Sequence, residues 1–441
     1  MNTRIKTLTP IWTGDIDQKS GLLQPSSIMG SLRWWTEATL RSINSKYVCD
    51  PTSDERRCPT EKKNEKYYCS ACLIFGATGI RRTFRLDVSG GRRVFTGGAL
   101  NIKPSGRSGG WYLGSGIVGE IYLEITPLDK DFDEGLVLLP LIIASKWGGI
   151  GAKTQHGYGV VKIKDCPEID FNRFKEAIEK ITGQERLSKL RIELRQGSNN
   201  GLPNLKEMFF AKVQFEITDT DWWKRVDGIK QALEPKDKKG NVIKDLQKRN
   251  EEILTSWFKT NSIPIAPAIK NWLRYDNGAR LWKTTNQNQI RRIEKWLFGT
   301  TERTCPSCYE KVREDRRNPR NFWCPNCRES IRKEEIFERI ASKINISCAY
   351  QVNNNLWEFR IWGWLPKDGA PMRFDRDGFL DNLKQALDGS GSVTVPWNQL
   401  LGGQTESHKL KVWREFDSSR DTVKPNESDI SNYIQSLLEG E

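Results

Sequence analysis

The stretch GGIGAKTQHGYG, residues 148–159, decides how the first part of this sequence is interpreted. Glycine or alanine occupies six of its twelve positions, and one lysine, Lys153, and one histidine, His156, lie among them. A loop with so few side chains lets its backbone come very close to another group. That group could be a mononucleotide phosphate, a dinucleotide, an RNA backbone, or a neighbouring strand of the same fold.

Spacing excludes two nucleotide-binding motifs. A Walker loop requires a glycine directly before its lysine, and here Ala152 precedes Lys153. A dinucleotide fingerprint that starts at Gly149 requires a glycine where this sequence has Thr154. The loop also follows an apolar, helix-like run, Leu136–Trp147, whereas the phosphate loops of both families lead from a strand into a helix. A polymer backbone or a purely structural turn remains.

The order of elements across residues 1–165 predicts a ferredoxin-like fold. Alternating apolar residues indicate strands, and apolar residues at helical spacing indicate helices. The resulting order is βαββαβ. One face of such a sheet stays free, and that face or the loops around it commonly bind RNA. The predicted elements are strand Arg4–Trp12, a helix capped by Ser26 or Ser27, strands 82–88 and 117–127, helix Glu134–Trp147 and strand Gly159–Lys164.

Two motifs of the first half recur, in the same order, in the second half. PSSIMGSLRWW (residues 25–35) corresponds to APAIKNWLRY (residues 266–275), and LIFGATG (residues 73–79) corresponds to WLFGTTE (residues 296–302). Matching segments at corresponding places indicate a duplicated unit. The sequence therefore predicts an α+β protein of two tandem ferredoxin-like domains.

Composition and cysteine spacing set the predicted boundaries. The first domain contains a cysteine-containing insertion, residues 45–72. The second contains a charged helical insertion, residues 222–260, and a second cysteine-containing insertion, residues 303–330. Residues 419–441 are polar, so we expect this tail to fray. The predicted order is a first domain (1–165), a linker helix (166–205), a second domain (206–418) and the polar tail (419–441).

The charge of the chain indicates a polyanionic partner. Its 441 residues carry a formal net charge of +14, with a pI near 9.2, and such an excess of lysine and arginine suits nucleic acid. Some of its 17 tryptophans could stack on unpaired bases. No apolar run is long enough for a membrane helix, and the N-terminus lacks the apolar core of a signal peptide. We therefore expect a cytoplasmic protein with reduced cysteines.

Clustered cysteines in a reduced protein indicate metal ligands. Two C-x2-C pairs separated by fifteen residues have the spacing of a zinc ribbon, in which four thiolates close the coordination shell of a structural zinc ion. The ligands of this site are Cys305, Cys308, Cys324 and Cys327. A second group has one C-x2-C pair and two scattered partners, and it forms either a second zinc site or ordinary thiols. This group consists of Cys49, Cys58, Cys69 and Cys72.

The glycine loop and the opening of the chain resemble a known family. The loop fits the pattern G-x-G-x5-G-[FY]-G, which resembles the signature loop of the RAMP superfamily of CRISPR-associated RNA-binding proteins. The segments LTPIWTGD, PSSIMGSLRWWTEATLR and LFGATG look more narrowly like the first-subunit family of type III-B Cmr effector complexes. This resemblance implies tandem ferredoxin-like domains. It also implies a subunit near the head of a helical backbone, which contacts the 3′ part of the guide RNA or the matching target RNA together with other RAMP subunits.

We expect RNA contacts from the signature loop, the first helix and a basic excursion. The excursion, residues 87–116, is glycine-rich and is expected to form a mobile hairpin laid across the guide; its alternative is a solvated loop. Arg33 could instead pair with Glu37 one helical turn away, and the neighbouring tryptophans could fill the core. The residues expected to contact RNA are Arg33, Trp34, Arg92, Arg93, Lys103, Gly149, Gly151, Lys153, His156, Gly157, Tyr158 and Gly159.

The sequence favours a binding subunit over a nuclease. Only two histidines are present, His156 and His408, and a lone histidine between lysine and glycines suits a phosphate clamp better than a general base. No compact carboxylate cluster indicates a two-metal site. The alternatives are an endoribonuclease that processes CRISPR transcripts with His156, and a zinc-stabilised scaffold without nucleic-acid contact.

Overall fold

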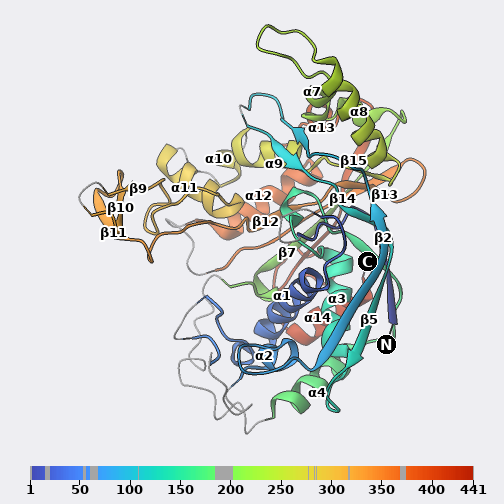
Figure 1. The fold of residues 1–441 in the computed structure, drawn as a ribbon, viewed down its shortest axis with the longest axis vertical. Coiled ribbons are helices and arrows are strands. Elements are labelled where there is room, and N and C mark those ends of the chain that lie inside the picture. The colour runs from blue at the N-terminus through green and yellow to red at the C-terminus, as the bar shows by residue number, and fades with distance from the viewer. Residues whose placement is uncertain are drawn as a thin grey trace.

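The computed structural model describes residues 2–14, 20–52, 56–59, 68–107, 109–183, 202–276, 278–282, 284, 286–315, 318–367 and 374–440. Two antiparallel sheets, one from each half of the chain, carry most of the helices (Figure 1). The predicted mixture of α and β structure is therefore confirmed.

The first sheet has the strand order β2-β5-β1-β6. Along β5, Ile121, Leu123 and Ile125 are buried while Glu120 and Tyr122 face solvent, because successive side chains of a strand point to opposite faces. Helices α1 and α3 cover the buried face (Figure 1). The order β1-α1-β2-β5-α3-β6 is the one predicted from the sequence. Its bounds are β1 Asn2–Thr7, α1 Pro25–Ile43, β2 Phe84–Arg93, β5 Ile117–Pro127, α3 Gly135–Trp147 and β6 Val161–Asp165.

The second sheet has the order β15-β7-β14-β13-β8, with β12 paired to β14. The alternating segment SVTVPW, residues 392–397, which by its pattern alone would be predicted as the last strand of this half, does not join the sheet. That segment lies between α12 and α13 and contains Pro396, which lacks an N–H for a ladder, whereas β15 pairs along β7. The bounds are β7 Met208–Ile217, β8 Ser262–Ile263, β12 Ile344–Ile346, β13 Ala349–Gln351, β14 Leu356–Trp364, α12 Arg376–Asp388, α13 Trp397–Leu400 and β15 Thr405–Glu415.

The basic excursion of the first half packs into the second half. It contains the short hairpin of β3 (Leu100–Ile102) and β4 (Trp111–Leu113), and Leu100, Ile102 and Leu113 are fully buried in the core that Trp257 shares. The prediction of a mobile hairpin is therefore wrong, because its apolar residues alternate and one face is covered. The covering helices are α7 Ile229–Leu233 and α8 Lys244–Phe258, within the predicted helical insertion.

The end of the chain is an ordered helix, α14 (Ile430–Glu439). Tyr433, Ile434 and Leu437 recur at helical spacing and are fully buried. The helix packs on α3, where the indole of Trp147 donates a hydrogen bond of 2.8 Å to the carbonyl of Leu437. The prediction of a fraying polar tail is wrong, because the polar composition hid this amphipathic spacing.

The remaining elements surround the two sheets. Within the segment predicted as a linker helix, residues 171–182 form α4. Residues 184–201 of that segment lie outside the described residues, as do 53–55 and 60–67 of the first cysteine insertion. No helix among the described ranges is long and apolar enough to span a membrane. The bounds are α2 Ser70–Phe75, α4 Phe171–Thr182, α9 Ala266–Asn271, the π-helix Trp272–Asp276, α10 Gly278–Leu281, α11 Gln287–Phe298, β9 Arg313–Glu314, β10 Asn321–Cys324 and β11 Glu329–Arg332.

Candidate functional site

The signature loop, residues 148–159, approaches other parts of its own chain. A Cβ at Gly151, where φ is +86°, would lie 2.8 Å from the carbonyl oxygen of Trp12. A Cβ at Gly157, where φ is +107°, would lie 2.6 Å from the sulfur of Cys348 in the second half. Only glycine allows these approaches without strain. The loop therefore joins α3 to β6 and packs the first half against the second.

The peptide N–H groups of these glycines already have partners. Gly151 donates to the hydroxyl of Ser31 at 2.8 Å, Gly157 to the carbonyl of Thr154 at 3.2 Å and Gly159 to the carbonyl of Pro10 at 2.8 Å. Although Gly151, Gly157 and Gly159 are among the residues expected to contact RNA, their N–H groups therefore bond within the chain in this structure. Other sequence-predicted positions in the loop are also engaged: the Gly149 carbonyl accepts the Trp35 indole N–H at 3.0 Å, and the buried Tyr158 hydroxyl donates to the Gly114 carbonyl at 2.6 Å.

The buried position of Tyr158 contradicts its predicted RNA contact. Its side chain has no exposed surface and packs against Trp257. Lys153 has a left-handed backbone with φ +57°, and its ammonium lies 3.9 Å from the centre of the Trp12 ring. Burial lowers the pKa of Lys153. The cation–π contact holds this charge at the edge of the loop.

His156 faces a cavity with a free ring nitrogen. Its Nδ1 is buried, and no described group bonds to it. Burial, and then the charges of Lys270 and Lys153, lower the pKa of His156 to about 3. The imidazole is therefore neutral near pH 7, so it can exchange hydrogen bonds but is a weak base.

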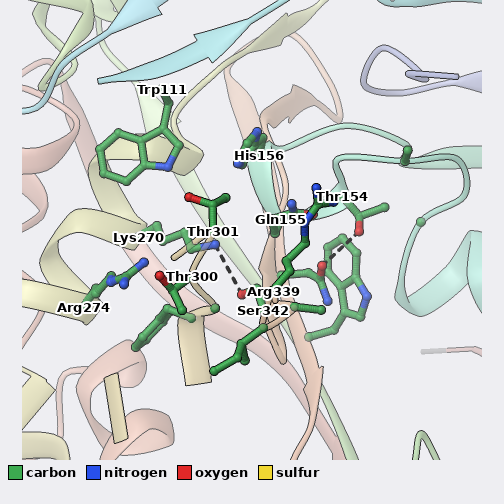
Figure 2. A pocket seen from close by; sticks show the side chains of 18 of the residues that line it. Trp111, Thr154, Gln155, His156, Lys270, Arg274, Thr300, Thr301, Arg339 and Ser342 are labelled. Carbon is green, nitrogen blue, oxygen red and sulfur yellow. Dashed lines mark hydrogen bonds between the residues drawn. The ribbon is translucent and has the colours of Figure 1, made fainter. Parts of the chain in front are cut away.

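The cavity lies between the signature loop and the two repeated motifs of the second half, and has a volume of about 1020 Å³ (Figure 2). The first half contributes Trp34 of α1, Trp111 of β4 and loop residues up to His156. The second half contributes Lys270 and Arg274, both from the APAIKNWLRY motif. Further lining residues are Thr154, Gln155, Thr300, Thr301, Arg339 and Ser342.

A buried lysine is the strongest electrostatic feature of this cavity. Lys270 is only 4% exposed, and its ammonium donates a hydrogen bond of 3.3 Å to the hydroxyl of Ser342. No ion pair joins it to a carboxylate among the described residues. Burial, and then the charge of Arg274, lower the pKa of Lys270 to about 7. A buried ammonium without a carboxylate is costly, which an anionic ligand would relieve.

The other charges of the cavity are partly neutralised. Arg274 pairs with Glu294 at 2.9 Å, and Lys295 lies 3.5 Å from Glu302. Arg339 is exposed at the rim and has no ion pair within the described part of the chain. Lys270 and Arg339 therefore make the cavity a site for an anion, and its aromatic walls offer ring faces.

The remaining predicted RNA contacts fall into two groups. Arg33 donates to Glu37 at 2.8 Å, to the Gly76 carbonyl at 2.9 Å and to the Cys72 sulfur at 3.3 Å, so all three of its nitrogens are engaged. The pairing with Glu37 is the alternative that the sequence left open. Trp34 is 36% exposed and lines the cavity. Outside the cavity, exposed on β2 or after β3, lie Arg92, Arg93 and Lys103.

Most residues of the second-half wall were not among those expected to contact RNA. Lys270 belongs to the repeated motif, in which Arg274 aligns with Arg33, so the repeat itself was the signal. A lysine inside an apolar helical segment could have been flagged as an unusual buried cation. Trp111 and Arg339 carried no local signal, because they reach the cavity only through the packing of the hairpin and of the segment before β12.

Two groups of four cysteines each have the geometry of a metal site. In each group the four sulfurs lie within 4.8 Å of one another. The sulfurs of Cys305 and Cys327 are 3.8 Å apart, those of Cys308 and Cys324 3.4 Å, and those of the first group's Cys49 and Cys72 3.8 Å. In a tetrahedron with Zn–S bonds of about 2.3 Å, sulfurs are about 3.8 Å apart, so both groups fit a metal ion. Cys58 and Cys69 complete the first group.

One family model matches the first half of the chain. Residues 4–162 match the model of the RAMP superfamily, which confirms the predicted resemblance over that part of the chain. No curated protein matches the sequence.

Several solved structures are similar to this chain, and three of them are described below. Cmr1 from Pyrococcus furiosus in its apo form is 14% identical with a TM-score of 0.34, and the alignment covers 84% of this chain and 89% of that chain. A chain of the type III-B Cmr-beta complex bound to cognate target RNA is 11% identical with a TM-score of 0.37, covering 87% and 99%. A chain of the Cmr-beta complex bound to target RNA and AMPPnP in the presence of ssDNA is 12% identical with a TM-score of 0.35, covering 87% and 98%.

Proposed function

We propose that this chain is a noncatalytic RNA-binding subunit of a type III-B CRISPR effector complex in antiviral defence. In this role it contacts guide RNA, target RNA or both near the 3′ end of the guide, in the cytoplasm and beside other RAMP subunits. The RAMP match of residues 4–162 supports the class. The cavity between the signature loop and the repeated motifs supports the binding role.

The observation that carries this proposal is the buried, carboxylate-free ammonium of Lys270 in an open cavity. A phosphodiester beside Lys270 and Ser342 would supply the missing negative charge. His156 would add one neutral hydrogen bond, and the exposed Trp34 would offer a face for a base. Such contacts position an RNA strand without identifying its sequence.

Two structural expectations belong to the same proposal. The domains 1–165 and 206–418 would be tandem ferredoxin-like units, supported by sheets in which the first strand of each half lies between the last and the third. Zinc would occupy both cysteine groups as a structural ion. Arg33 supports zinc in the first group, because a guanidinium that donates to Cys72 favours the thiolate form.

The low basicity of His156 supports a noncatalytic role. A general base works best when its pKa lies near the operating pH, and the pKa of about 3 lies far below it. The alternative function, an endoribonuclease that uses His156, is tested by incubating the chain with CRISPR repeat RNA in EDTA. Cleavage that disappears in His156→Ala would establish the enzyme and refute this proposal.

RNA binding by variants of the cavity tests the proposal directly. Lys270→Met keeps the volume of the side chain and removes its charge, and Arg339→Gln removes a charge at the rim without disturbing the core. Each should weaken binding of single-stranded RNA and lower the salt slope by about 0.7, the value for one phosphate. The control is Lys238→Gln, an exposed lysine of the helical insertion that does not line the cavity. Unchanged affinity and slope in both cavity variants would refute the proposal.

A further inference from the structure

The segment that carries Cys305, Cys308, Cys324 and Cys327, residues 303–315 and 318–340, is called the metal ribbon here. It is connected directly to the wall of the cavity. Thr300 pairs with Ile340 and Thr304 with Phe337 in isolated antiparallel bridges, and these two segments lead into and out of the ribbon. Thr300 and Ile340 also line the cavity. The strands β9, β10 and β11 lie beyond them and project from the body of the protein (Figure 1). An RNA strand that left the cavity on this side would therefore meet the ribbon.

The two faces of the ribbon sheet differ sharply. Phe322, Cys324 and Ile331 point inward and are buried around the four cysteines. The opposite face carries Trp323 at its centre, 36% exposed. Arg313 of β9 lies directly across from Trp323, which places both side chains on this outer face.

The residues that surround Trp323 on the outer face of β10 and β11 are polar. Ser330 lies directly opposite, and Asn321 and Arg332 form the next pair on the same face. The amide of Asn321 donates to Ser330 at 2.9 Å, and Ser330 donates to the buried Asp315 at 2.6 Å. These hydrogen bonds hold the polar residues in place beside the indole, which remains 36% exposed.

An exposed tryptophan is unusual in this chain. Among the described residues, only Trp34 and Trp323 are exposed tryptophans, and Trp34 lines the cavity. The cysteine core does not need the Trp323 ring, because that ring lies on the other side of the sheet. A large aromatic face on a polar surface therefore fits a ligand with a flat ring.

The charge of the outer face and its two turns is positive. Arg313, Arg320 and Arg328 are exposed, and no ion pair between described residues involves any of them. Arg332 is neutralised by Glu335 at 2.5 Å. Unpaired arginines around an exposed aromatic ring complement the phosphates and bases of a single strand, whereas a protein interface core is usually depleted in charge.

We propose that the outer face of the metal ribbon binds the single-stranded RNA that leaves the cavity, with one base stacked on Trp323 and the backbone contacted by Arg313 and Arg328. This inference rests on the proposed function for the strand that enters the cavity. It adds a second contact surface, formed by a different part of the chain, and makes affinity depend on RNA length. Because stacking tolerates every base, the contact extends the binding site without selecting a sequence.

The test compares two oligoadenosines of roughly 4 and roughly 16 nucleotides, which span the site sizes of known single-strand-binding folds. With the full chain, Trp323→Ala should weaken binding of the longer RNA roughly 5- to 150-fold, the range for loss of one stacked base. Binding of the shorter RNA, which the cavity accommodates, should stay unchanged. Trp323→Phe should keep most of the affinity, and Arg313→Gln should lower the salt slope by about 0.7 for the longer RNA alone.

The control is Tyr122→Ala, which removes an exposed ring from the first sheet, at 50% exposure. Metal content and thermal unfolding of Trp323→Ala should match those of the unchanged protein, because the ring lies outside the cysteine core. If the unchanged protein binds both RNAs and Trp323→Ala alters neither affinity, the ribbon inference fails alone. If the unchanged protein binds neither RNA, the proposed function fails with it.

Discussion

If RNA binds beside Lys270 as proposed, the unusual ionisation of this lysine should make the affinity depend on pH in a defined direction. Burial and the charge of Arg274 hold the pKa of Lys270 at about 7 when the cavity contains no ligand. A phosphodiester beside the ammonium favours the charged form, which raises the pKa toward its ordinary value of 10.5. Binding then takes up a proton, so affinity is greatest below pH 7 and falls as the pH rises.

The magnitude follows from these two pKa values. With the free value about 7 and a bound value raised well above pH 8.5, the dissociation constant rises about 25-fold between about pH 6.5 and 8.5. His156 adds nothing in this range, because its pKa of about 3 keeps the ring neutral throughout. The slope approaches a tenfold loss of affinity per pH unit above about pH 8, which is the limit for one proton.

The assay is the binding of a short oligoadenosine with hydroxyl ends, whose own groups do not titrate in this range, at constant ionic strength. The unchanged protein and Lys238→Gln should show the full pH dependence, and Lys270→Met should bind more weakly with a flat profile. Thermal unfolding at each pH separates loss of binding from loss of structure. A flat profile in the unchanged protein, with its fold intact, would refute the assignment of the phosphate to Lys270.

Three further predictions concern stability and metal. Gly157→Ala should destabilise the protein by about 2–5 kcal/mol, because the new methyl group meets a sulfur of the second half at a left-handed backbone position; Gly109→Ala, which meets no atom within 4 Å, should leave the melting temperature unchanged. Elemental analysis should find two zinc ions, and Cys305→Ser and Cys69→Ser should each remove one; a single ion in the unchanged protein would leave one group as plain thiols. Leu437→Ala should cost about 2–5 kcal/mol in denaturant unfolding, since it opens a cavity under α14; a loss below about 0.5 kcal/mol would mean that the helix contributes little to stability.

Local patterns accounted for the parts of the fold that depend on neighbours in sequence. Alternation and helical spacing placed the strands and helices of the first half, because burial on one side imposes a period on the sequence. The same reasoning failed for β15 and α14. Turn residues and polar composition outweighed the weaker periodic signals there. Both elements depend on contacts with distant parts of the chain, such as the pairing of β15 with β7 and the packing of α14 on α3.

By itself, the sequence determined the ribbon tetrad of Cys305, Cys308, Cys324 and Cys327 and the resemblance of the signature loop, since both depend on residue types at short, fixed spacings. It left open whether the scattered first cysteine group forms a site, and the tertiary structure brings those four sulfurs together. Only the tertiary structure decided how the loop is used. Its glycines pack against Trp12 and Cys348, and the buried Lys270, more than a hundred residues away in the chain, lines the same cavity as the loop. The exposure of a tryptophan, the burial of an ammonium and the pKa that results are set by which distant surfaces meet. Residue spacing along the chain cannot predict the burial of Lys270, because the residues that exclude water from it come from both halves.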